Sequence, residues 1–158
     1  MRWLVALDES EFSERILGWM RTFLHPKHTT VTVVHAPGCA GDGRCQGART
    51  RASATGGDGG DVAASSRTFL QQSFETVEVV LCEGVPSQKI LHLIQEHRPH
   101  LVVSGMRGFY HTAGLAFGRV SQRLLAYAPC SLMLVPGKVT QGGGLRVMLA
   151  TESRLSRY

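Results

Sequence analysis

Residues 2–10 read RWLVALDES, and this stretch decides the class of fold. After its first residue the run Arg2–Leu7 is wholly apolar, which is typical of a strand that is buried on both faces in a parallel sheet. The residues that follow favour a helix, because Ser10 can cap its first turn. Glu11 and Glu14 suit the positive end of that helix. A buried strand that passes directly into a helix indicates an α/β fold.

The same alternation continues along the chain. Apolar spacing and turn residues predict strands at 2–7, 29–36, 76–84, 100–105 and 130–136, and helices at 10–23, 62–74, 86–97 and 118–128. Between them, residues 37–60 hold eight glycines, and we predict a surface loop there with no packed element. Strands that alternate with helices require right-handed crossovers and a parallel sheet with helices on both faces.

Composition describes an ordinary globular protein. The chain has 158 residues, of which 43% are hydrophobic and 18% charged, and this predicts one main domain. No apolar run is long enough to span a membrane, and the N-terminal run lacks a small-residue cleavage site, so we expect a cytoplasmic protein. The net charge of +5 is scattered rather than gathered in a stripe, which argues against a nucleic-acid partner.

The sequence gives little support for catalysis or for a metal. The four cysteines form no CxxC pair and are expected to be free thiols. GxxxxGK[ST], GxSxG and HExxH motifs are absent, and the histidines lack metal-ligand spacing. We interpret His35, at the end of a predicted strand, as a core or edge histidine. The protein is therefore predicted not to be an enzyme, with slow turnover of a bound ligand left open.

Three glycines stand at fixed spacing after the fourth predicted strand, in GMRGFYHTAGLAFGR, residues 105–119. A phosphate needs main-chain N–H groups directed at it and no Cβ in the way, and glycine at positive φ supplies both. Gly105 and Gly108 would shape such a loop, and Gly118 would begin a helix whose positive end favours an anion. Taken alone, the pattern fits a phosphate site and a simple tight turn equally well.

The segments VALDES, VVHA, EGVPSQKIL, HLVVSGMRG and GRVSQRLLAYAPCSLMLV resemble the universal stress protein family. The resemblance covers residues 1–136, apart from the loop after the second strand. It implies an open five-stranded α/β sheet that is Rossmann-like, of the adenine nucleotide alpha-hydrolase type, with strand order 3-2-1-4-5. It also implies a homodimer through the last strand and, in many members, bound ATP. The family motif G-x-x-G-x9-G-(S/T) is matched at all three glycines.

Transferred position by position, the resemblance implies a nucleotide site with three parts. Ala6 and Leu7 would line the adenine pocket, Asp8 would meet the ribose or the adenine, and Ala36 would pack on the base. Ser104 and Gly105 would lie under the sugar and the first phosphate. Gly108, Gly118, Arg119, Val120 and Ser121 would surround the remaining phosphates. Asp8 also has a simpler interpretation, because an acidic residue after a strand often helps a helix to begin.

Arg119 departs from the family motif, which has Ser or Thr there. A hydrogen bond from a hydroxyl to a charged phosphate is worth about 1.5–3 kcal/mol, so its loss weakens binding roughly ten- to a hundredfold. Arginine could replace it with a bidentate phosphate contact or could point outward. Ser121 could supply the missing hydroxyl. Arg107 lies in the same loop and could contact phosphate or water.

Residues 146–152, RVMLATE, resemble RWLVALD at 2–8. The likeness follows a glycine linker at 142–144, and a chance likeness between two apolar strands is the alternative. We divide the chain into a universal stress protein domain at 1–137 and a segment at 138–158 that resembles the start of a second repeat. Such a strand would pair with a sheet edge of its own chain or of a partner subunit.

Two functions remain from the sequence. The first is a stress-response protein that binds ATP, with Mg²⁺ left open, as a regulatory ligand. The second is a dimeric interaction module of the same fold that binds no nucleotide. Asp8 and the glycine spacing favour the first function, and Arg119 favours the second. A response-regulator or electron-transfer domain is a weaker third interpretation, because the acidic cluster is limited to Asp8 and Glu9.

Overall fold

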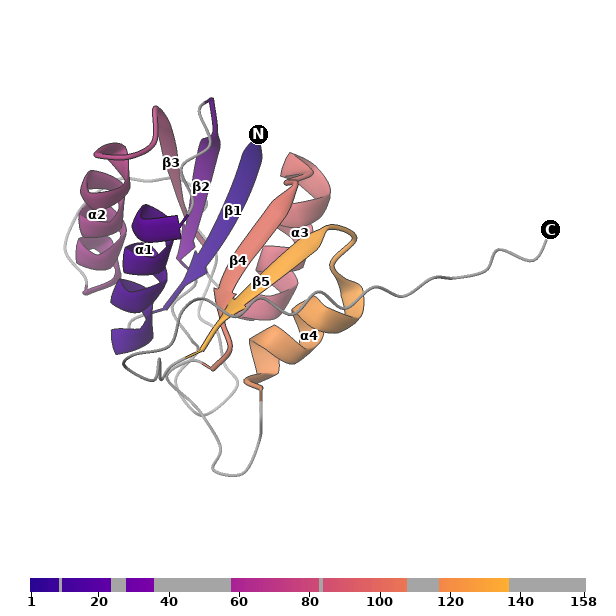
Figure 1. Cartoon of the computed structure of the whole chain (residues 1–158). Helices are drawn as coiled ribbons and strands as arrows, with labels where there is room; N and C mark the ends of the chain where they lie inside the picture. Colours follow the sequence, from indigo (N-terminus) through magenta and orange to yellow (C-terminus); the bar gives the residue numbers. More distant parts are fainter. Residues whose placement is uncertain (9, 24–27, 36–57, 83, 108–116, 137–158) are drawn as a thin grey trace.

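A computed structural model describes residues 1–8, 10–23, 28–35, 58–82, 84–107 and 117–136 of the chain. Within them, strands and helices alternate from β1 to β5 (Figure 1). The strands are β1 (Arg2–Leu7), β2 (Thr30–His35), β3 (Thr76–Leu81), β4 (Leu101–Gly105) and β5 (Ser131–Val135), and the helices are α1 (Glu11–Phe23), α2 (Asp58–Gln71), α3 (Pro86–His97) and α4 (Arg119–Tyr127). All four strand pairings are parallel, in the order β3-β2-β1-β4-β5. The predicted fold class and strand order are confirmed.

Helices cover both faces of this sheet (Figure 1). On the face of α1 and α2, Trp3, Val5 and Leu7 pack with apolar residues of those two helices. On the face of α3 and α4, Leu4 and Ala6 pack with Ile90, Ile94 and Leu124, among others. Successive residues of β1 thus enter opposite cores, because side chains alternate along a strand. This explains the continuous apolar run that decided the fold.

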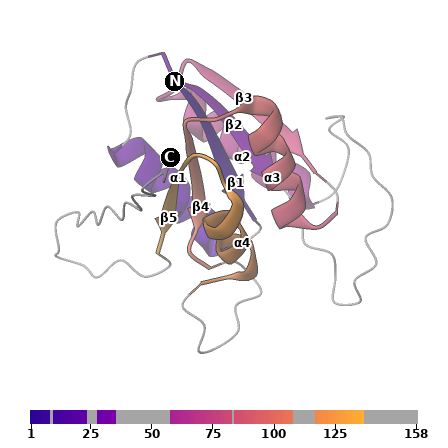
Figure 2. The same ribbon diagram turned by 90° about the vertical axis from the view of Figure 1, so that its right-hand side faces the viewer.

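The strand order reverses between β1 and β4. From β1 the chain winds through β2 to β3 in one direction, then returns to place β4 and β5 on the other side of β1. Open α/β sheets bind their ligands at the carboxyl ends of the strands beside such a reversal. In Figures 1 and 2, α4 begins at the end of the sheet toward which the strand arrows point. The fold therefore directs attention to the ends of β1 and β4.

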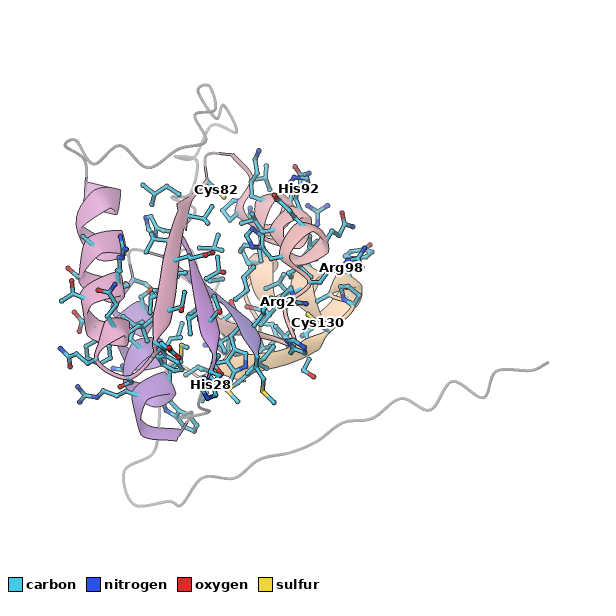
Figure 3. The ribbon with its side chains drawn as sticks, turned by 90° about the horizontal axis from the view of Figure 1, so that it is seen from above. Arg2, His28, Cys82, His92, Arg98 and Cys130 are labelled. Atoms are coloured by element: carbon cyan, nitrogen blue, oxygen red, sulfur yellow. The ribbon has the colours of Figure 1, made fainter. Side chains whose placement is uncertain are left out.

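At the opposite end of the sheet, hydrogen bonds join Arg2 to Arg98 and His100. The Arg2 guanidinium donates to the Arg98 carbonyl, with Nε and Nη2 at 3.3 and 3.1 Å. The His100 N–H donates to the Arg2 carbonyl at 2.8 Å, and the Arg2 N–H donates to Nδ1 of His100 at 3.0 Å. Figure 3 shows Arg2 and Arg98 together at this end. These bonds occupy the amino ends of β1 and β4 with structural contacts.

Helix α2 begins earlier than predicted. It starts at Asp58, inside the stretch that was predicted to hold no packed element, and ends at Gln71 rather than at Phe74. Two glycines in the first turn cost about 1 kcal/mol each relative to alanine, which packing further along the helix can offset. Ser66 and Leu70 supply that packing, since both are almost completely buried.

Several predictions concern residues outside the described ranges. Ala36 and Gly108 of the predicted nucleotide site lie there, as do most of the 37–60 loop and residues 138–158. Cys39 and Cys45 also lie outside these ranges. Cys82 and Cys130 are free thiols, as expected.

Candidate functional site

The carboxyl ends of β1 and β4 lie side by side. Ala6 of β1 is the register partner of Ser104 of β4. Leu7, the last residue of β1, and Asp8 after it therefore lie next to Gly105. Five of the predicted site residues are thereby brought together at the carboxyl end of the sheet from two distant parts of the sequence. They lie between β1 and β4, where the strand order reverses.

The first turn of α4 is joined to the end of β4. The Gly118 N–H donates to the Met106 carbonyl at 2.9 Å. The Ser121 hydroxyl lies 2.7 Å from the Gly105 carbonyl and 3.1 Å from that of Met106, and donates toward them. The Met106 N–H in turn donates to the Val135 carbonyl, at the end of β5. These bonds hold Gly118 and Ser121, and with them the first turn of α4, beside the end of β4.

The beginning of α4 has the electrostatics of an anion site. Gly118 is its N-cap and makes no side-chain capping bond, and the first turn holds no acidic residue. The first N–H groups of a helix have no acceptor within the helix, and its dipole places partial positive charge there. Arg119 is exposed at the first helical position and adds a full positive charge. An anionic ligand would satisfy both the N–H groups and this charge.

Gly105 differs from the prediction in its backbone geometry. Positive φ was expected there, but among the described glycines only Gly84 has positive φ. Gly118 was predicted to begin the helix, and it is the N-cap of α4, with φ −72° and ψ 162°. At Gly105 the reason for glycine is a close approach, since a Cβ there would lie 2.8 Å from the Arg107 carbonyl oxygen. The tight turn after β4 therefore requires glycine at this position whether or not a phosphate is bound.

Asp8 organises the start of α1. Its Oδ1 accepts the Ser10 N–H at 3.1 Å and also contacts the Ser10 hydroxyl. The Ser13 hydroxyl lies 2.6 Å from the Asp8 carbonyl and accepts the Asp8 N–H at 3.0 Å. The simpler interpretation of Asp8, that it helps a helix to begin, is therefore observed. The same bonds hold the half-buried Asp8 carboxylate in one position, directly after the carboxyl end of β1.

The two faces of the sheet give neighbouring site residues different surroundings. Ala6 belongs to the core cluster on the side of α3 and α4, against which Val120 is also packed. Leu7 belongs to the cluster on the side of α1. On the α4 side, therefore, the side chain of Ala6 can border a ligand, whereas Leu7 can contribute only its backbone.

The serines of the site serve the protein's own main chain. Ser121 is 2% exposed, and its hydroxyl proton is directed at the two carbonyls at the end of β4. It therefore does not replace the hydroxyl that the family motif has at position 119. Ser104 is also buried, with its hydroxyl 3.4 Å from the Gly105 carbonyl. Arg107 is exposed in the turn that follows.

Sequence reasoning missed two residues of this site. Ser13 fixes Asp8, and Met106 accepts the bond from Gly118. Ser13 occurs within an amphipathic helix, where a serine usually faces water. Its position three residues after Ser10, in the first turn of the helix, is the only sequence signal for a role at the helix start. The role of Met106 depends on its backbone and leaves no trace in the sequence.

The remaining candidate groups are structural. His35 is completely buried, as the core interpretation predicted. Burial raises the pKa of the Cys82 thiol, with Lys89 acting in the opposite sense, and burial likewise raises the pKa of Cys130. Raised pKa values leave these thiols protonated and weakly nucleophilic at neutral pH. Among the described residues, no three metal-ligating side chains gather at one point, and no helix is both long and apolar enough to cross a membrane.

Comparison with known proteins assigns the family. The model of the universal stress protein family matches residues 1–136. The chain belongs to the universal stress protein family. The resemblance read from the sequence is thus confirmed. No curated protein sequence matches this universal stress protein.

Solved structures share the fold at low sequence identity. The hypothetical protein MJ0577 has a TM-score of 0.69 at 14% identity, with 88% of this chain and 97% of that one covered. A universal stress protein in complex with cAMP has a TM-score of 0.62 at 15% identity, covering 86% and 96% of the two chains. A family protein from Arabidopsis thaliana with AMP bound has 0.55 at 16%, covering 86% and 91%. At these identities the likeness concerns the fold.

Proposed function

We propose that this universal stress protein binds an adenine nucleotide at the carboxyl ends of β1 and β4, as a regulatory ligand in a stress response. The observation that carries the proposal is the start of α4. Its first turn has no side-chain cap and no acidic residue, and bonds from Gly118 and Ser121 hold it against the end of β4. A phosphate at this position would accept hydrogen bonds from the first N–H groups of α4, which have no acceptor within the helix.

Other residues fit the rest of a nucleotide. Ala6 presents only a methyl group at the carboxyl end of β1 on the α4 side, the smallest side chain that a flat base could meet there. Asp8 offers a carboxylate that Ser10 and Ser13 already hold in position, and ribose hydroxyls are suitable donors to it. Structures of the same fold have been determined with cAMP and with AMP, which supports an adenine nucleotide as the ligand class.

ATP is the nucleotide that the family resemblance implies, and Arg119 is the residue that would decide how well its phosphate chain is held. The hydroxyl of the family motif is missing at 119, and Ser121 is engaged with the main chain. The exposed guanidinium of Arg119 would bind phosphate oxygens in its place. Mg²⁺ would be bound through the phosphates of ATP, because it prefers oxygen ligands and retains water.

A homodimer through β5 is the partner that the family resemblance implies. In the structure β5 is an edge strand with partly buried apolar side chains. Such an edge pairs readily with a second strand. We propose that two copies associate through it whenever the edge is accessible.

The test is a titration of ATP, AMP and cAMP into the purified protein and into Arg119→Glu. Loss of the arginine contact should weaken ATP binding ten- to a hundredfold, since a charge-assisted bond is worth about 1.5–3 kcal/mol. A glutamate at the first helical position should leave stability unchanged or raise it by about 0.3–1 kcal/mol, because acidic residues suit helix N-termini. Calorimetric titration and thermal melting measure the two effects.

Arg67→Glu is the matched control. Arg67 is exposed on α2, which covers the opposite face of the sheet, and the substitution makes the same change of charge. Its ATP affinity should equal that of the wild type. Equal losses in the two variants would mean that net charge, rather than the α4 site, governs binding.

The alternative function, an interaction module without nucleotide, has one specific observation in its favour. Gly105 and Ser121 are both accounted for by the turn that joins β4 to α4. No binding of any of the three nucleotides to the wild type, together with intact self-association, would establish this alternative.

A further inference from the structure

A hollow lies between the carboxyl end of α3 and the turn that joins α4 to β5, two parts of the chain that meet at one end of the molecule (Figure 1). Its volume is about 450 Å³, and it is lined by Ile94, Gln95, Arg98, Pro99, Pro129 and Cys130. Small-molecule sites commonly enclose about 300–1,000 Å³. The hollow lies at the amino ends of β4 and β5, whereas the proposed nucleotide site lies at the carboxyl ends of the strands.

Apolar groups form most of the wall of this hollow. Ile94 belongs to the core under α3 and α4, and Cys130 packs at the border of that core. Pro99 and Pro129 contribute their rings and have no main-chain N–H to offer. Burial raises the pKa of the Cys130 thiol, so the wall carries no charge there at neutral pH. The wall therefore suits an apolar body.

Arg98 supplies a positive charge to the hollow. It is exposed, and none of the six described residues that line the hollow is acidic. In the part of the chain that the structure describes, no carboxylate forms an ion pair with the Arg98 guanidinium. The charge is therefore available to a ligand.

Arg2 reinforces this positive charge. The dipole of α3 places partial negative charge at its carboxyl end, which by itself would disfavour an anion. The Arg2 guanidinium offsets that charge, because it donates to the Arg98 carbonyl with Nε and Nη2 at 3.3 and 3.1 Å (Figure 3). Two guanidinium-bearing residues thus meet beside an apolar wall, which is the arrangement that an anion with an apolar body would match.

The backbone of Arg98 is a second reason to assign its side chain a role. Arg98 is the C-cap of α3, with φ 45° and ψ 60°, and among the described residues other than glycine only His28 also has positive φ. A helix usually ends on glycine or asparagine in this left-handed region, because a larger side chain is strained there. An arginine at this cap therefore lowers stability for something that its guanidinium supplies.

We propose that this hollow is a second binding site and that its ligand is a small monocarboxylate with an apolar body. The apolar body lies against Ile94, Pro99 and Pro129. The carboxylate accepts charge-assisted hydrogen bonds from the Arg98 guanidinium, and the Gln95 amide is a further donor. The site works whether or not a nucleotide binds, since it lies at the other end of the sheet.

Three probes with the same alkyl chain test the charge of the ligand: octanoate, octanamide and octylamine. Octanoate should bind to the wild-type protein about fivefold more tightly than octanamide, because an exposed charge pair is worth up to about 1 kcal/mol. Octylamine should bind most weakly, since Arg98 repels it. Calorimetric titration gives the affinities. Benzoate is tested beside octanoate, and binding of either supports the proposal while it tells an aromatic body from an aliphatic one.

Alkylation of Cys130 shows whether the probe occupies the hollow. Cys130 lines the wall and is partly exposed, so a bound carboxylate should slow its reaction with iodoacetamide. Mass spectrometry of the peptide that carries Cys130 separates this reaction from that of the other cysteines. The proposal is overturned if neither octanoate nor benzoate slows it at saturating concentration.

Arg98→Gln removes the charge and keeps a side chain at the cap. It should abolish the preference for octanoate and leave the affinity for octanamide unchanged. Arg67→Gln is the matched control, because Arg67 is exposed on α2 at the opposite face of the sheet. It should retain the fivefold preference. Equal losses in the two variants, or equal binding of octanoate and octanamide to the wild type, overturn the proposal.

Gln95→Trp tests the place of binding by filling the hollow. It should prevent octanoate binding and slow the alkylation of Cys130 even without a ligand. Glu96→Trp is the control, because Glu96 is exposed on the same helix and does not line the hollow. It should behave as the wild type, and thermal melting checks that each variant is folded. Wild-type octanoate affinity in Gln95→Trp also overturns the proposal.

Discussion

Gly105 illustrates how a single residue constrains a turn beside the proposed ligand site. A Cβ at this position would meet the Arg107 carbonyl oxygen at 2.8 Å, closer than side-chain carbons approach backbone oxygen. The turn after β4 can therefore form only around glycine. Because this turn also brings Met106 to Gly118, the constraint at Gly105 determines where α4 begins.

Alanine substitution separates this role from the general effect of glycine. Gly105→Ala should lower the free energy of unfolding by about 1–3 kcal/mol, since the backbone must shift to relieve the contact. Gly18→Ala should raise it by roughly 0.5–1 kcal/mol, because Gly18 lies within α1 and an added Cβ there meets nothing within 4 Å. Urea denaturation measures both changes. Equal effects at the two positions would refute the role assigned to Gly105.

At the scale of elements, the junction between β4 and α4 determines the candidate site. Ser121 connects the first turn of the helix to the two carbonyls at the end of the strand. The Asp8 carboxylate performs a similar task at the junction of β1 and α1. Both strand-to-helix junctions are thus fixed by buried or half-buried polar side chains, and the site is formed between them.

Ser121→Ala tests the junction. Removing the hydroxyl takes the Ser121 donor from the Gly105 carbonyl and leaves the Met106 carbonyl with the Gly118 N–H alone. The loss should cost about 1–3 kcal/mol in the free energy of unfolding and weaken nucleotide binding through the displaced helix. Ser65→Ala, at an exposed position on α2, should stay within about 0.5 kcal/mol of the wild type. Chemical denaturation provides the measurement. Wild-type stability in Ser121→Ala would show that the helix is positioned by other contacts.

The elements were largely predictable from sequence, and their junctions were not. The continuous apolar run of β1 and the helical spacing of apolar residues in α3 follow directly from which side chains are buried. The positions of both elements were therefore predicted to within a residue or two. The start of α2 at Asp58 was missed, because the glycines of its first turn contribute nothing to helical patterning. The task of Ser121 could not be foreseen, since a hydroxyl near a helix start serves phosphate or carbonyl equally well. Only the tertiary arrangement decides between them.

At the scale of the whole molecule, the two ends of the sheet have different tasks. The amino end is closed by Arg2, Arg98 and His100, whereas the carboxyl end holds the start of α4 without a side-chain cap. The edge strand β5, which lies at one end of the strand order, forms a third region. Structural contacts, the proposed nucleotide site and the proposed dimer edge thus occupy separate parts of one sheet.

The most direct test of the nucleotide site is a titration followed by the amide resonances of the isotope-labelled protein. Saturable shifts are expected at Arg119, Val120 and Ser121 and at the ends of β1 and β4, with Arg98 and His100 unchanged. The three α4 amides should respond to ATP more strongly than to adenosine, since the proposed site places the phosphates at the start of α4. Shifts confined to the amino end of the sheet, or no saturable shift with any adenine nucleotide, would contradict the account.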